Sequence, residues 1–278
     1  MELRQEDIDR VVTAALAEDV GSGDATTLAL VPEGGSCRAD LLLEEPGVVC
    51  GLPAVAAVFR ALDPAVQVEV KLKEGTAVSD VPAVLAEVEG PARAILSGER
   101  VALNLLGRLC GIASLTRRFV ELTEGTPTTV LDTRKTTPGL RALEKYAVRC
   151  GGGRNHRAGL YEGVLVKENH LRVAGGVTAA LAALDGRVDG LPVEVEAETL
   201  AQVKEALDAG APRILLDNMR PEEVREAVGL TAGRADLEAS GGVSLATVRA
   251  YAETGVDFVS VGALTHSARS LHVSLEVR

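Results

Sequence analysis

The chain has 278 residues, a formal net charge of −11 and only 2% aromatic residues, with no Trp. It therefore needs an aliphatic core, and it lacks the aromatic platform on which single-stranded nucleic acid stacks. The charged N-terminus has no apolar signal-peptide core, and Gly51 and Pro53 interrupt the longest apolar run, residues 47–59. We expect a cytoplasmic protein with neither a nucleic acid nor a membrane as its partner.

The four cysteines, Cys37, Cys50, Cys110 and Cys150, are far apart in the sequence and form no CxxC pair. This spacing fits neither a zinc motif nor a disulfide framework. We expect buried, reduced thiols.

The first third of the chain mixes helical and strand patterns. Residues 5–18 carry apolar side chains on one helical face, residues 66–73 alternate with period two before a Glu-Gly turn, and residues 83–88 form a second apolar run. These patterns predict a small sheet with helices packed on it.

Residues 98–122 show the longest helical periodicity, with Ser97 as the expected N-cap. A helix of this length is equally consistent with a junction between domains or subunits and with an ordinary core helix.

After residue 127 the pattern becomes strand, loop, helix. Helices are expected at 138–149, 199–209, 221–228 and 244–254, which predicts repeated βα units and a parallel sheet, either closed as a barrel or open and doubly wound. In a barrel, the strand ends would all lie on the C-terminal rim, where such enzymes place their sites. Six short apolar runs end at Asp132, Lys167, Glu196, Asp217, Ser240 and Val261.

Basic residues gather between residues 132 and 172, where nine basic residues stand against four acidic ones. Three separate βα segments bring these cations to the expected rim, which predicts a site for a small, highly anionic ligand. The strongest candidates are Arg134, Lys135, Arg157 and Lys167, and His156 is placed to donate a hydrogen bond to a carboxylate.

Carboxylates end two of the predicted strands, at Glu196 and Asp217. In a basic site, such groups hold ribose hydroxyls, bind Mg²⁺ or stabilise a cationic transition state. Glu194 shares a strand face with Glu196 but lies deeper, and we expect it to form a structural ion pair.

Two glycine-bearing loops follow the last two predicted strands, at Ser240-Gly241-Gly242 and at Gly262-Ala263. The first of these loops is expected to open a helix near Ser244. Late loops of βα barrels often bind phosphate through close backbone approach.

The ordered motifs resemble those of the quinolinate phosphoribosyltransferase family, also called nicotinate-nucleotide pyrophosphorylase. The resemblance covers nearly the whole chain. The motifs that carry it are Asp-Thr-Arg-Lys-Thr at 132–136, Gly-Gly-Gly-x-Asn-His-Arg at 151–157, Lys-Glu-Asn-His at 167–170, Glu-Val-Glu at 194–196, Leu-Asp-Asn at 216–218, Glu-Ala-Ser-Gly-Gly at 238–242 and Val-Gly-Ala-Leu-Thr-His at 261–266.

The resemblance implies an incomplete parallel α/β barrel of fewer than eight strands with an N-terminal α+β open sandwich domain. We expect the sandwich at residues 1–110 and the barrel at 111–278, with the extreme C-terminus packing back on the sandwich. The implied reaction converts quinolinate and phosphoribosyl pyrophosphate, with Mg²⁺, into nicotinate mononucleotide, pyrophosphate and CO₂ for NAD biosynthesis. The implied assembly is a homodimer with a shared site, or an oligomer of such dimers.

The resemblance also implies roles for individual residues. Lys135 would face pyrophosphate, and Glu196 and Asp217 would hold the ribose hydroxyls and Mg²⁺, directly or through substrate or water. These three and Lys167 are the expected catalytic residues. Arg100, from the partner subunit, Thr133, Arg134, His156, Arg157 and Lys167 would bind quinolinate or its surroundings, and Ser240, Gly241, Gly242, Gly262, Ala263 and His266 would lie at the phosphates.

Two other functions remain open. A phosphoribosyltransferase of the same fold would act on another heteroaromatic acid such as nicotinate, although the number of cations favours a substrate with two carboxylates. A non-catalytic sensor of a phosphoribosyl compound would have less need of both Glu196 and Asp217.

Overall fold

The computed structural model describes residues 3–188 and 190–278, which form two compact units. The first unit is assembled from three stretches of the chain, Met1–Arg117, Thr136–Gly152 and Leu264–Arg278. The second unit contains Arg118–Lys135 and Gly153–Ala263.

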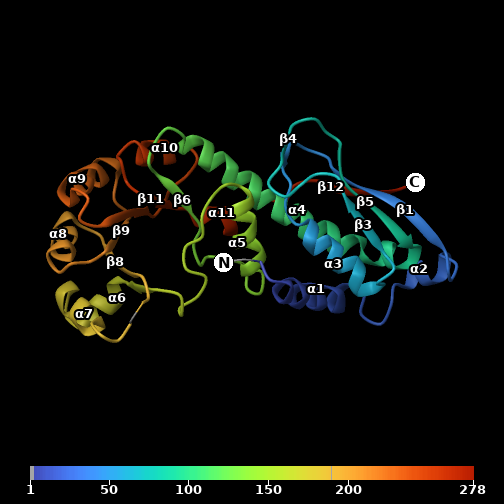
Figure 1. Ribbon diagram of the computed structural model, residues 1–278, viewed down its shortest axis with the longest axis horizontal. Coiled ribbons are helices and arrows are strands. Elements are labelled where there is room, and N and C mark those ends of the chain that lie inside the picture. Colours follow the sequence, from blue (N-terminus) through green and yellow to red (C-terminus); the bar gives the residue numbers. More distant parts are fainter. Residues whose placement is uncertain (1–2, 189) are drawn as a thin grey trace. The chain divides into compact units, whose positions relative to one another are not determined.

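The first unit is built on an antiparallel four-stranded sheet of order β12-β1-β5-β3 (Figure 1). The C-terminal strand β12 pairs along β1, with Ala39 opposite Val277 and Leu43 opposite Val273. The strands of this unit are β1 (Ser36–Leu43), β2 (Gly47–Val48), β3 (Gln67–Val70), β4 (Ala77–Val78), β5 (Ala83–Pro91) and β12 (Val273–Val277). Its helices are α1 (Gln5–Asp19), α2 (Ala25–Leu30), α3 (Leu52–Leu62) and α5 (Arg141–Cys150), together with most of α4 (Ala92–Thr123).

The second unit contains a six-stranded parallel sheet of order β6-β11-β10-β9-β8-β7, with α7, α8 and α9 on its outer side (Figure 1). From β7 to β11, each strand pairs with the next strand along the chain, and β11 also pairs with β6. The first two strands in the sequence, β6 and β7, do not pair with each other. One isolated bridge, between Leu131 and Arg154, stands on the β6 side of that seam. The expected incomplete barrel with fewer than eight strands is therefore confirmed.

The strands and helices of the second unit alternate regularly. Its strands are β6 (Thr129–Leu131), β7 (Val164–Val166), β8 (Val193–Ala197), β9 (Arg213–Asp217), β10 (Asp236–Ser240) and β11 (Phe258–Ser260). Its helices are α6 (Glu168–Ala174), α7 (Val177–Leu184), α8 (Leu200–Asp208), α9 (Pro221–Thr231) and α10 (Val248–Ala252). The short helix α11 (Ala263–His266) starts at the last residue of this unit, and its other residues belong to the first unit.

Three helix starts differ from the sequence prediction. Helix α4 begins at Ala92, directly after Pro91, so Ser97 lies inside it and donates a hydrogen bond to Asp24 rather than capping the helix. Helix α5 begins at Arg141 because Gly139 has a φ of +84°, a left-handed conformation that no α-helix continues. Helix α10 begins at Val248, since the residues from Ser244 first form a hydroxyl-bonded turn with Thr247.

Candidate active site

A cavity of about 340 Å³ lies at the C-terminal ends of the parallel strands of the second unit. Nine of the predicted site residues line it, and they come from the ends of β6 to β10 and from the loop before β7. They are Thr133, Arg134, Lys135, His156, Arg157, Lys167, Glu196, Asp217 and Ser240.

Asp132 holds the loop before β7 against the end of β6. Its carboxylate is fully buried and accepts hydrogen bonds from the Asn155 side chain at 2.6 Å and from the His156 backbone N–H at 2.9 Å. Its own N–H donates to the Arg154 carbonyl. Asp132 therefore positions the loop that carries His156 and Arg157.

Both ring nitrogens of His156 have protein partners. Nδ1 accepts a hydrogen bond from the Arg157 N–H at 2.8 Å, so the ring proton lies on Nε2, which is 2.9 Å from Glu194 Oε2. His156 therefore supports Arg157 and contacts Glu194 while it lines the cavity, and its hydrogen bond to a ligand carboxylate stays a prediction.

A buried ion network lies beneath His156. Glu194 makes the ion pair expected for it, with Arg213 Nε 3.1 Å from Glu194 Oε1, and the Arg213 guanidinium also contacts Glu238. Burial opposes ionisation of Glu194, but the hydrogen bond from His156 and the charge of Arg213 lower its pKa. Burial and the neighbouring Glu194 charge raise the pKa of Glu238 to about 7.

Arg157 and Arg134 form the cationic side of the cavity. Burial, and next the nearby Arg134 guanidinium, lower the pKa of Arg157, while the Arg157 side chain donates to the Gly163 carbonyl at 2.6 Å. Two guanidinium groups this close repel each other unless an anion lies between them. The arrangement suits a planar carboxylate, which accepts paired hydrogen bonds from Arg.

Glu196 and Asp217 form the acidic side of the cavity. Lys167 Nζ lies 3.1 Å from Glu196 Oε2. Burial and the adjacent Glu196 charge raise the pKa of Asp217. Oxygens of Glu196, Glu198 and Asp217 all lie within 4.8 Å of one another. Oxygen ligands so close together are the kind that Mg²⁺ prefers.

The loop after β10 requires glycine at its first glycine position, Gly241. Gly241 has a φ of +95°, and a Cβ there would lie 2.2 Å from Asn218 Oδ1. Asn218 in turn donates from its N–H to the Ser240 carbonyl and from its side chain to Asp217 Oδ2 at 2.7 Å. Gly241 therefore lets the β9 and β10 loops meet and holds Asp217 in place.

The remaining predicted residues lie elsewhere in the described chain. Gly241, Gly242, Gly262 and Ala263 belong to the second unit but do not line the cavity, and Arg100 and His266 belong to the first unit.

The sequence analysis missed Glu238 and Ser260 as lining residues. Glu238 lies two residues before Ser240 on β10, and Ser260 lies two residues before Gly262. The period-two rule for strands was the signal that would have found both.

None of the described helices is long and apolar enough to cross a membrane.

A parallel α/β barrel unit has cations and carboxylates together at its C-terminal rim, and the same chain carries a unit with an antiparallel sheet. A rim of this composition is typical of an enzyme that acts on an anionic substrate. The model of the quinolinate phosphoribosyl transferase C-terminal domain matches residues 112–276, and that of the N-terminal domain matches residues 24–110. The chain belongs to the quinolinate phosphoribosyltransferase family, as its motifs predicted.

Individual relatives agree with this assignment. The chain is 44% identical over 261 residues to a probable nicotinate-nucleotide pyrophosphorylase (carboxylating) of Bacillus subtilis, covering 94% of this chain and 90% of that protein. It is 43% identical to the probable Synechocystis enzyme of the same name, over 97% and 92% of the two chains. The nicotinate-nucleotide pyrophosphorylase structure from Francisella tularensis matches with a TM-score of 0.95 and 37% identity, over 100% and 98% of the chains.

Proposed function

We propose that the chain transfers the phosphoribosyl group of phosphoribosyl pyrophosphate to quinolinate and releases pyrophosphate and CO₂, forming nicotinate mononucleotide for NAD biosynthesis. The observation that carries this proposal is one cavity lined both by two arginines and by two carboxylates, Glu196 and Asp217. A dicarboxylate and a ribosyl cation need these two kinds of group.

Arg134 and Arg157 would each bind a carboxylate of quinolinate and turn its ring nitrogen toward C1 of the ribose. Positioning of this kind supplies a large part of the rate acceleration of a two-substrate reaction. Asp132 and His156 would keep Arg157 in the required orientation, because Asp132 accepts the hydrogen bond of the His156 backbone N–H and His156 Nδ1 accepts that of the Arg157 backbone N–H.

Glu196 and Asp217 would stabilise the positive charge that develops on the ribose as the bond to pyrophosphate breaks. Lys135 would attract the departing pyrophosphate, while Lys167 would help hold a quinolinate carboxylate. Once the quinolinate nitrogen is alkylated, its positive charge stabilises the carbanion left by loss of CO₂ from the adjacent ring carbon. These steps need no covalent bond to the protein.

Glu196, Glu198 and Asp217 would hold Mg²⁺, directly or through substrate or water, because their oxygens converge within 4.8 Å. When bound, Mg²⁺ would neutralise negative charge on pyrophosphate. Ser240 would bind the 5′-phosphate. The other residues expected at the phosphates are Gly241, Gly242, Gly262, Ala263 and His266.

The active assembly would be a homodimer, or an oligomer of dimers, in which Arg100 reaches the partner's cavity. Within the chain the Arg100 side chain is 64% exposed, and its ion-pair contact to Glu99 is 4.0 Å long. The four free cysteines favour a reducing compartment, and we place the enzyme in the cytoplasm.

The decisive experiment incubates the purified protein with phosphoribosyl pyrophosphate, Mg²⁺ and quinolinate, and measures CO₂ and nicotinate mononucleotide together. We expect equal amounts of both. Mononucleotide from nicotinate without CO₂ would instead support a monocarboxylate transferase. Binding of phosphoribosyl pyrophosphate without turnover of either acid would support a sensor.

A further inference from the structure

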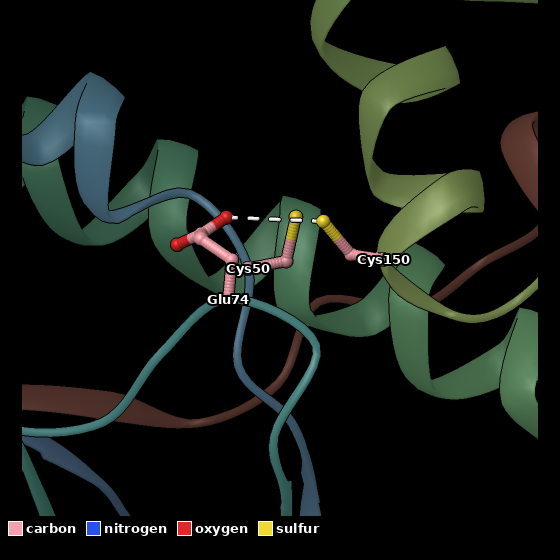
Figure 2. Close-up of side chains that lie close together, drawn as sticks. All are labelled: Cys50, Glu74 and Cys150. Carbon is pink, nitrogen blue, oxygen red and sulfur yellow. Dashed lines mark hydrogen bonds between the residues drawn. The ribbon is translucent and has the colours of Figure 1, made fainter.

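Three side chains that the proposed reaction does not use come together in the first unit. Cys50 precedes α3, Glu74 lies in the turn before β4, and Cys150 ends α5. One atom from each side chain, two sulfurs and a carboxylate oxygen, lies within 4.8 Å of the other two. Figure 2 shows the two sulfurs directed toward each other beside the Glu74 carboxylate.

The distance between two of these atoms is close to the distance between neighbouring ligands of a tetrahedral metal ion, and all three atoms lie within 4.8 Å of one another. Cys150 Sγ lies 3.9 Å from Glu74 Oε2. Zn²⁺ binds thiolate at about 2.3 Å and carboxylate at about 2.0–2.2 Å, which places neighbouring ligand atoms roughly 3.6–3.8 Å apart. Small side-chain shifts would therefore close the site around an ion.

Backbone donors already orient Glu74. Its Oε1 and Oε2 accept from the Gly51 N–H at 3.1 and 2.9 Å, and Oε1 also accepts from the Leu52 N–H at 2.9 Å. Each carboxylate oxygen has two lone pairs, so Oε2 keeps acceptor capacity on the side of the thiols. Support of this kind is what holds ligands in known metal sites.

Two arginines lie near the three side chains. Arg117 donates hydrogen bonds to the carbonyls of Gly75 and Gly151, the residues that follow Glu74 and Cys150. The Arg149 guanidinium interacts electrostatically with the Cys150 thiol. Two thiolates, a carboxylate and a divalent ion together carry one negative charge, which these arginines offset. The Tyr146 hydroxyl also interacts with the Cys150 and Glu74 side chains and is a further oxygen at the cluster.

We propose that Cys50, Glu74 and Cys150 form a binding site for one thiophilic divalent cation, Zn²⁺, with water or Tyr146 completing its coordination. The two sulfur ligands distinguish this site from the all-oxygen group at Glu196. The bound ion would join the start of α3, the turn before β4 and the end of α5.

The test uses the full chain, reduced and stripped of metal with a chelator, in excess Mg²⁺ so that the oxygen site is filled. Zn²⁺ is titrated in competition with a chromophoric chelator, and stoichiometry is checked by native mass spectrometry. We expect one Zn²⁺ per chain. Because loss of a supporting residue alone costs roughly 10–100-fold in metal affinity, Cys150→Ser should cost about 100-fold or more.

Cys37→Ser is the matched control, since Cys37 lies on β1 outside the cluster and should leave zinc affinity unchanged. A measurement without variants guards against misfolding: Zn²⁺ should protect Cys150 of the wild-type chain, but not Cys37, from alkylation. Binding well below one equivalent, equal affinity in Cys150→Ser and wild type, or no protection of Cys150 would each overturn the site.

Discussion

Arg157 shows how a side chain in this site depends on its neighbours. Its backbone N–H donates a hydrogen bond to His156 Nδ1, and its guanidinium donates one to the Gly163 carbonyl. Burial, and next the charge of Arg134, lower the pKa of Arg157. Because its orientation is already fixed, Arg157 would lose little conformational freedom on binding the anion proposed for it.

Arg157→Ala should lower kcat/KM for quinolinate by an amount corresponding to roughly 2–5 kcal/mol of transition-state binding, because a desolvated carboxylate loses its partner. Steady-state kinetics with quinolinate as the varied substrate measure this. Arg172→Ala is the control, because Arg172 is exposed on α6 and pairs only with Glu168 among the ion pairs described. Equal losses in the two variants would contradict the assignment.

Glu238 should make the stability of the protein depend on pH. Folding raises its pKa from 4.5 to about 7, so the stability tied to its neutral form is full below pH 4.5 and is lost as pH rises through about 7. Glu238→Gln keeps a neutral side chain at every pH. The unfolding free energy of wild type minus that of the variant should therefore fall between pH 5 and pH 8, by an amount on the order of 2–3 kcal/mol.

Urea unfolding of both proteins at the two pH values measures this difference. A difference that stays constant with pH would show that Glu238 is ionised throughout the range. Asp236→Asn, at the exposed start of the same strand, is the control and should show no such trend.

At single positions, the sequence predicted the groups that line the cavity better than the groups that support them. Arg134, Arg157 and Lys167 were found because charge at strand ends is visible in a sequence. The clamp made by Asp132 and the engagement of both His156 nitrogens were not found, because they depend on where the chain folds back. The sequence analysis expected Cys50 and Cys150 to be buried, reduced thiols and did not place them together, because their proximity also depends on where the chain folds back.

Among the elements, helix α4 packs closely against the segment before β12, because two of its residues at the contact are glycine. A Cβ at Gly111 would lie 1.9 Å from the Arg269 carbonyl oxygen, and Gly107 accepts a hydrogen bond from the Leu271 N–H at 2.9 Å. The segment before β12 thus lies directly on the backbone of the helix. Only residues without a side chain permit such close approach.

Gly111→Ala should destabilise the protein by about 3 kcal/mol or more, because a backbone carbonyl has to move. Gly229→Ala is a matched control within α9, where an added Cβ meets nothing within 4 Å. It should be neutral or stabilising by about 0.5–1 kcal/mol, as expected for Ala against Gly in a helix. Thermal and urea unfolding measure both, and similar effects of the two changes would be inconsistent with the packing described.

The βα rhythm predicted the six parallel strands to within one residue at their ends, because buried parallel strands read as short apolar runs. The antiparallel sheet was harder. Strand β12 and the pairing of β1 with β5 depend on contacts between distant segments, and α3 lies in a run whose apolar residues fit helix and strand equally well.

At the scale of the whole molecule, the shared site proposed for a dimer gives a complementation test. Arg100→Ala and Arg157→Ala chains should each be nearly inactive alone. Mixed under conditions in which subunits exchange, they should regain up to about a quarter of wild-type activity, because half of the dimers are mixed and each mixed dimer keeps one intact site.

Native mass spectrometry of the mixture verifies that mixed dimers form. Absence of recovered activity in a verified mixture would show that Arg100 acts within its own subunit or not at all. A mixture of Arg100→Ala with wild type calibrates the activity expected from partial occupancy.

The discontinuous first unit also has a consequence for how the protein is made. Arg278 pairs with Asp40, 238 positions earlier in the chain, and β12 completes the sheet that β1 begins. At synthesis rates of about 5–20 residues per second, β1 waits roughly 10–50 s before its last partner leaves the ribosome. During that interval one edge of β1 has unpaired backbone groups, and the incomplete chain offers that edge for pairing with other chains.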